Sequence, residues 1–170
     1  VLRGTAMIEA GSPDVFANQI IEKAWTGWQR AQYCDMRGQR NYFVLRLLRL
    51  IGAIRHGDFF IRLARDPSLN KFGFALQLIP AQYCDRFYNA TLQNGNVVIM
   101  GIEYQMTPWG LGRAVNFHFI ARQANDWQYT TAGLFGMGSR PTDNLRRASV
   151  PASEIIHYAR PVDADGTRPA

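Results

Sequence analysis

The sequence of 170 residues has few cysteines, few histidines, few lysines and no long apolar run. Its two cysteines, Cys34 and Cys84, are too few for a disulfide framework, so we expect two half-buried thiols in a reducing cytoplasm. The apolar runs are too short to cross a membrane. No charged and then apolar leader opens the chain, so no signal peptide is expected.

Catalytic and metal-binding patterns are also absent from the sequence. The three histidines, His56, His118 and His157, form no pair at ligand spacing. Asp35 and Asp85 directly follow the two cysteines and disfavour a reactive thiolate. The carboxylates are scattered, and no glycine-rich phosphate loop lies between a strand and a helix. We therefore expect no enzyme, and no catalytic, cofactor-binding or metal-binding residues.

The composition is that of a folded, basic protein. Apolar residues make up 47% and charged residues 19%, which excludes a disordered chain. The net charge is +6, and all but two of the 19 basic residues are arginine. Arginine suits interfaces and nucleic acid, although a GC-rich coding sequence explains the same bias. The charge permits weak, salt-sensitive DNA binding without demonstrating it.

Apolar spacing predicts a first amphipathic helix after an irregular lead-in over residues 1–13. We expect Ser12 as its N-cap and Pro13 at the first helical position, with an end near Tyr33. Trp25 and Trp28 lie three residues apart on one face of this helix. Core packing is the favoured interpretation of this pair, and a stacking platform for nucleic acid is the alternative.

A second amphipathic helix is expected over residues 39–56, with Gly57 as its C-cap. Its arginines, Arg46 and Arg49, would then lie on a solvated face, or on a face that meets DNA or a partner. The apolar stripe, which we expect to lie over the core, consists of Phe43, Leu47, Leu50, Ile51 and Ile54.

Beyond the second helix the apolar pattern changes to the alternation of strands. Asn94-Gly95 signals a turn, residues 108–112 should join two strands as a hairpin, and residues 122–146 form a long glycine-rich loop. Helices followed by antiparallel strands indicate an α+β fold. The expected strands cover residues 58–64, 74–79, 96–104, 114–121 and 155–158.

One α+β domain is expected over residues 14–160, followed by a truncated linker over 161–170. The chain begins at Val1 and ends in a proline-rich stretch, so we expect it to be part of a longer protein.

The pentapeptide Ala-Gln-Tyr-Cys-Asp occurs at 31–35 and again at 81–85. The flanking residues differ, so we expect no duplicated unit.

Several segments, in their order over about residues 18–161, resemble the lambda-type bacteriophage portal proteins. The chain departs from that family at His56, where an aspartate is usual, and at Asp58, where a glutamate is usual. The matching segments are Trp25 and Trp28 with Cys34-Asp35 and Gly38; His56 to Arg62; Leu76 to Ala81 with Asp85; Asn94 to Tyr104; Gly112 to Phe119; and Arg147, Val150 to His157 and Arg160-Pro161.

The resemblance implies a structural role without a cofactor or a membrane. Portal proteins form a ring, usually a dodecamer, at one capsid vertex of the virion, after assembly in the host bacterial cytoplasm. Double-stranded DNA passes through the ring during packaging and ejection. The ring meets the terminase large subunit, the capsid protein and the head-completion proteins that connect head to tail. This chain would be part of the outer wing of one subunit.

Within that wing, the residues expected to contact a neighbouring subunit or the DNA backbone are Arg46, Arg49, Arg113 and Arg146. The alternative is a small basic nucleic-acid-binding module, or a degenerate prophage remnant. A nucleic-acid-binding module would bind DNA tightly at low salt, whereas a portal subunit would assemble into a ring.

Overall fold

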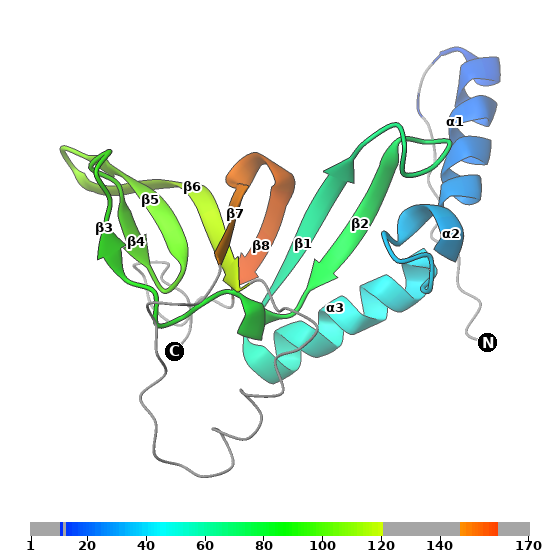
Figure 1. The fold of residues 1–170 in the computed structure, drawn as a ribbon. Coiled ribbons are helices and arrows are strands. Elements are labelled where there is room, and N and C mark those ends of the chain that lie inside the picture. The colour runs from blue at the N-terminus through cyan, green and yellow to red at the C-terminus, as the bar shows by residue number, and fades with distance from the viewer. Residues whose placement is uncertain (1–10, 12, 121–146, 160–170) are drawn as a thin grey trace, which may run out of the picture. The chain divides into compact units, whose positions relative to one another are not determined.

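The computed structural model describes residue 11, residues 13–120 and residues 147–159. Helices come first and antiparallel strands follow, which confirms the predicted α+β fold (Figure 1). The described chain divides into two compact units. Of the described residues, those up to Ile79 and those from Ile156 to Ala159 form unit 1, and those between Pro80 and Ile155 form unit 2. Each unit has its own sheet, with three strands in unit 1 and five in unit 2. The expected single domain over 14–160 stays a prediction.

The first helix, α1 (Val15–Trp28), begins later than expected. Asp14 is its N-cap, because its carboxylate accepts hydrogen bonds from the N–H groups of Phe16 and Ala17 at 3.0 and 3.1 Å. The expectation that Pro13 is the first helical residue is therefore wrong, as is a cap at Ser12, which itself lies outside the described residues.

The first helix also ends earlier than expected. It stops at Trp28, and the predicted end near Tyr33 is wrong because Arg30 takes an extended conformation that breaks the helix. A separate short helix, α2 (Ala31–Cys34), follows.

The second long helix, α3 (Tyr42–His56), begins three residues later than the predicted residue 39. Asn41 caps it by accepting a hydrogen bond from the N–H of Val44 at 2.9 Å. The preceding N–H groups of Gln39 and Arg40 are bonded to the Asp35 carboxylate, so they do not join the helix. Gly57 ends it in the left-handed region at φ 74°, which confirms the predicted C-cap.

The sheet of unit 1 is built on β1 (Asp58–Arg65). It pairs antiparallel with β2 (Phe74–Ile79), and β8 (Ile155–Ala159) lies on its other side. The helical core of this unit consists of Trp28, Cys34 and Leu45. The indole of Trp28 is 6% exposed, which confirms the core interpretation of that residue.

The sheet of unit 2 follows a short helical turn, η1 (Ala81–Tyr83). Neighbouring strands pair antiparallel throughout, and a second turn, η3 (Ala152–Glu154), follows the sheet. Unit 2's last strand was not expected from the sequence. The strands are β3 (Ala90–Thr91), β4 (Val97–Ile99), β5 (Ile102–Thr107), β6 (Gly110–Ile120) and β7 (Arg147–Pro151).

A tight turn at Met100-Gly101 corrects the prediction of one strand over residues 96–104. Both residues have positive φ, 51° and 82°, so β4 and β5 form a hairpin. A Cβ at Gly101 would lie 2.8 Å from the carbonyl oxygen of Asp85, so only glycine fits there. The predicted turn at Asn94-Gly95 is confirmed, and so is a hairpin after β5. The predicted turn over residues 108–112 is too wide, because Thr107 pairs with Gly110 and residues 110–112 belong to β6.

Both cysteines are fully buried rather than half-buried as expected, and neither is in a disulfide. The expected glycine-rich loop over 122–146 and the linker over 161–170 lie outside the described residues, as does nearly all of the lead-in over 1–13. Among the helices of the described part, none is long and apolar enough to span a membrane.

The repeated pentapeptide forms the same local structure in each unit. Arg30 and Pro80, which precede the two copies, have nearly equal dihedral angles, with ψ of 145° and 144°. Each copy makes a short helical turn, buries its cysteine, and uses its aspartate to accept an N–H from two residues further on, at Arg37 and at Phe87. The surrounding elements differ, in line with the expectation of no duplicated unit.

Candidate docking site

Unit 1 contains an open apolar groove of about 250 Å³, lined by residues of α1, α3, β1, β2 and β8. Its floor is one face of the sheet. Ile61 lies opposite Leu78 and Leu63 opposite Leu76 in the β1–β2 register, so all four side chains share that face. All four are only half-buried. The floor of the groove is therefore apolar surface that the described chain does not fully cover.

The wall of the groove is aromatic. The rings of Trp25 and Trp28 stack with centroids 5.3 Å apart, and Tyr42 meets Trp25 edge-on at 5.4 Å. Trp28 also stacks on Phe74 and donates its indole N–H to the carbonyl of that residue at 3.0 Å. This hydrogen bond fixes the orientation of the indole in the wall.

The rim of the groove carries two of the predicted contact residues, Arg46 and Arg49, which lie one turn apart on α3. Arg46 is exposed, and the half-buried guanidinium of Arg49 lies 6.0 Å above the ring of Phe59. In the part of the chain that the structure describes, neither guanidinium has a carboxylate within salt-bridge distance. The groove thus combines an apolar floor with two cations.

The other two predicted contact residues are not at this groove. Arg113 is exposed on β6, in unit 2, and Arg146 lies outside the described residues. The structure therefore brings together only the pair on α3. Sequence reasoning missed that Trp25 and Tyr42 line the same groove, because they become neighbours only when α1 and α3 pack together.

The apolar stripe of α3 faces outward, which overturns the expectation that it covers a core. The helix meets β1 with its other side, where Leu45 is buried and a Cβ at Gly52 would lie 3.7 Å from Phe59. At 100° per residue, the predicted stripe lies roughly opposite Leu45. We call these residues the outer stripe; their exposed fractions run from 36% at Phe43 to 73% at Ile54, with Leu47, Leu50 and Ile51 between.

Unit 2 contains an ion pair between a buried aspartate and a half-buried arginine, which sequence reasoning did not single out. Arg147 donates from Nε and Nη2 to the same oxygen of Asp85, at 3.1 and 2.9 Å. Its guanidinium also lies 4.3 Å above the ring of Tyr88. Asp85 and Arg147 both lie in the segments that resemble portal proteins. That resemblance is the sequence feature that could have pointed to them.

A second polar cluster in unit 2 is centred on Glu103. Its carboxylate accepts hydrogen bonds from the amides of Asn94, Asn96 and Asn116, and lies 3.4 Å from Nε2 of His118. Burial opposes ionisation, but the three amides and the nearby histidine together lower the pKa of Glu103. Burial lowers the pKa of His118, against the opposing effect of Glu103. These bonds hold β4, β5 and β6 together.

The described groups offer no sign of reactive chemistry. Burial, followed by the charge of Asp35, raises the pKa of the Cys34 thiol to about 11, which confirms that its neighbour disfavours a thiolate. Across the described ranges, no group of three or more His, Cys, Asp or Glu side chains is arranged to hold a metal ion. The groove and the outer stripe are exposed apolar surfaces of the kind that protein contacts use.

Comparison with known proteins gives two matches. The family model described as "Phage portal protein, lambda family" matches residues 3–170. A protein of Halomonas phage phiHAP-1 described as "Probable portal protein" is 31% identical over 102 residues, which is 60% of this chain and 20% of that protein. The match thus spans only about a fifth of that relative's length. Because the family model covers nearly every residue, the chain belongs to the lambda family of phage portal proteins.

Proposed function

We propose that this chain is part of the wing of a ring-forming portal subunit at a capsid vertex. The ring, a dodecamer, is the conduit for double-stranded DNA during packaging and ejection. It meets the terminase large subunit, the capsid protein and the head-completion proteins, and it assembles in the host cytoplasm before it becomes part of the virion. Its role is structural rather than enzymatic.

The observation that carries this proposal is the outward-facing outer stripe of α3, next to an apolar groove with two arginines on its rim. Monomeric proteins rarely expose a contiguous apolar surface of this kind, and such surfaces mark sites of protein association. Aromatic residues and arginine are the types enriched in protein interfaces. The surface therefore supports a subunit that is completed by neighbours.

The test is electron microscopy of the full-length subunit purified under assembly conditions. We expect rings with a uniform rotational symmetry. Only monomers or irregular aggregates, under every condition that supports assembly of a related portal, would contradict the proposal.

DNA binding by this chain separates the proposal from a small nucleic-acid-binding module. Fluorescence anisotropy with a labelled duplex should show weak binding at low salt. Tight binding whose logarithm falls linearly with the logarithm of salt concentration, together with an absence of rings, would favour the module.

A further inference from the structure

We propose that the groove of unit 1 receives the N-terminal half of α1 from a second copy of the chain. This inference rests on the proposed ring and names the surfaces that join neighbouring subunits. One copy would supply the groove, with Arg46 and Arg49 on its rim. The next would supply the exposed start of α1, around Phe16 and Ile20.

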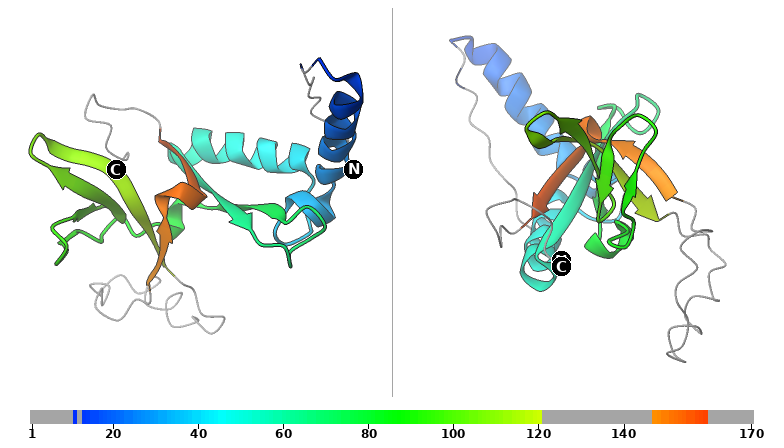
Figure 2. Two further views of the ribbon diagram at one scale, coloured as in Figure 1. Left: turned by 90° about the horizontal axis from the view of Figure 1, so that it is seen from above. Right: turned by 90° about the vertical axis from the view of Figure 1, so that its left-hand side faces the viewer.

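The first half of α1 has the apolar surface that such a contact needs. Val15 and Phe16 are 67% and 72% exposed, and Ile20 is 53% exposed. In Figure 1 and in both views of Figure 2, these turns of α1 extend away from α3 and from strands β1 and β2 of unit 1. These three side chains are thus exposed in the described part of unit 1, whereas Trp28 at the far end of the same helix is buried.

The charges of the two surfaces are complementary. α3 contains Arg46, Arg49 and Arg55 and no acidic residue, so its charge is +3 without its histidine. α1 and its cap contain Asp14 and Glu22 against one lysine, which gives −1. A carboxylate has about four acceptor sites, so Asp14 can cap α1 and also meet a guanidinium. The contact would give the rim arginines the carboxylates that they lack within the described chain.

The same copy cannot fill its own groove with this segment. Trp25, near the end of α1, lines the groove, and Phe16 lies nine residues earlier on the same straight helix. At 1.5 Å per residue, that separation is roughly 13 Å along the helix axis. The start of α1 would have to fold back through a broken helix to reach the groove. An α1 start that fills the groove must therefore belong to another molecule.

Such a contact is heterologous, because a projecting helix end on one copy meets a groove on the next. Each copy then has one free groove and one free helix end until the assembly closes on itself. Heterologous contacts close into rings where the rotation between copies permits it. Arg46 and Arg49 would provide the polar contacts at the centre of this interface, and the aromatic wall of the groove would provide the apolar contacts.

The decisive experiment places a photo-cross-linking amino acid at Phe16 of the full-length subunit and irradiates assembled rings. We expect cross-links between copies that map by mass spectrometry to residues 42–49 or to the β1–β2 strands. The matched control carries the same group at Trp109, which is 97% exposed in unit 2. This control should give no cross-link to the groove.

Charge reversal tests the role of the rim. The double variant Arg46→Glu, Arg49→Glu should reduce the Phe16 cross-link at least fivefold, whereas Arg113→Glu should leave it unchanged. Circular dichroism and thermal unfolding of each variant show whether it folds. If the double variant unfolds, Arg46→Glu alone serves, because Arg46 is exposed.

The outcomes distinguish this inference from the proposed function. Rings that form without any cross-link from Phe16 to the groove would overturn the inference and leave the ring proposal standing. Cross-links from a group at Ile156, in the groove, to a different phage protein would also overturn it. The absence of rings in the unmodified subunit would count against the proposed function itself.

Discussion

Arg147 and Asp85 are 62 residues apart in sequence, yet both Nε and Nη2 of the arginine bond to one oxygen of the aspartate. The side chain of Asp85 is almost completely buried, and the side chain of Arg147 is 19% exposed. The aspartate also accepts the N–H of Phe87 on its other oxygen. The pair therefore ties the start of β7 to the turn after η1 within unit 2.

Removing the charge of this aspartate tests the importance of the pair. Asp85→Asn should destabilise unit 2 by about 3 kcal/mol, because the loss of one partner leaves a largely desolvated guanidinium. Thermal unfolding, with hydrogen exchange at the β7 amides as a local readout, measures the change. The exposed Asp66→Asn is the control and should cost under about 0.5 kcal/mol. Equal stability of both variants would show that the pair contributes little.

The stability of the chain should fall in mild acid because of His118. Burial lowers its pKa below the usual 6.5, so below that pH the unfolded chain binds a proton that the folded chain does not. Stability is therefore complete above about 6.5 and declines as the pH falls toward the lower, folded-state value.

Melting temperatures at pH 7.5 and 5.5 measure this effect of His118. The variant His118→Asn should show a smaller drop between the two pH values than the unmodified chain. An identical drop in both proteins would assign the pH dependence to other groups.

The two thiols should be unreactive in the folded chain. Both are buried, and a pKa of about 11 leaves on the order of 0.1% of Cys34 as thiolate at pH 8. Alkylation followed by mass spectrometry should show no label until denaturant unfolds the chain, after which both react. Labelling of the native chain as fast as free cysteine would instead support a reactive thiol.

The outer stripe should matter for association and not for folding. Ile54→Glu should leave the melting temperature of the chain nearly unchanged, because the side chain is 73% exposed. It should nevertheless reduce ring formation by the full-length subunit, as counted in electron micrographs. Leu45→Glu, on the buried face of the same helix, is the contrasting variant and should unfold unit 1. Rings at the unmodified yield with Ile54→Glu would exclude the stripe from the interface.

The spacing of apolar residues and the capping residues predicted where helices and strands lie better than which of their faces are buried. The 3.6-residue apolar period located α3, but the period alone does not say which side of a helix meets the sheet. In the structure the packed side is marked by the buried Leu45 and by Gly52, where an added Cβ would be in ordinary contact with Phe59. The sequence therefore predicted the outer stripe as a group of residues and placed it on the wrong side.

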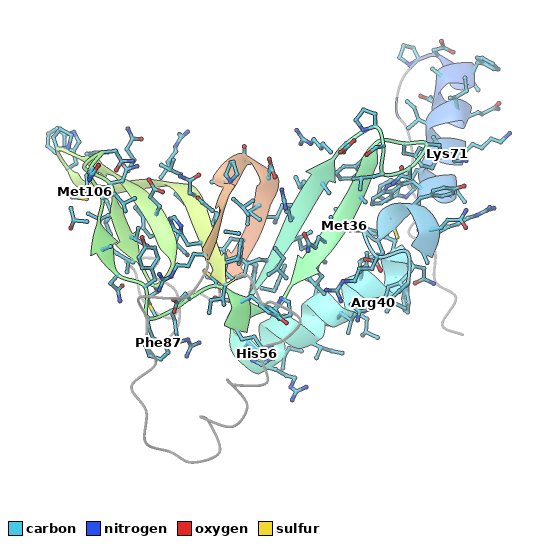
Figure 3. All side chains as sticks on the ribbon, in the orientation of Figure 1. Met36, Arg40, His56, Lys71, Phe87 and Met106 are labelled. Carbon is cyan, nitrogen blue, oxygen red and sulfur yellow. The ribbon has the colours of Figure 1, made fainter. Side chains whose placement is uncertain are left out.

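The candidate site was predictable only in part, for a similar reason. Arg46 and Arg49 were expected contact residues because they are arginines on an amphipathic helix, and the structure places both on the groove. Figure 3 shows how the side chains of α3 and of the neighbouring elements are distributed, with Arg40 and His56 labelled at the two ends of the helix region. The groove floor joins β1 and β2 to β8, from near the end of the described chain. Such long-range neighbours follow from tertiary packing, which local patterns do not encode.

The repeated pentapeptide has a consequence for how the chain folds. In each copy the helical turn and the aspartate bonds close over only two to five residues, as in the bonds from Arg40 and Phe87 to the two carboxylates. Closing so short a loop costs little chain entropy, so such a turn can form early. Each unit thus contains a turn that can form before the contacts between distant strands and helices.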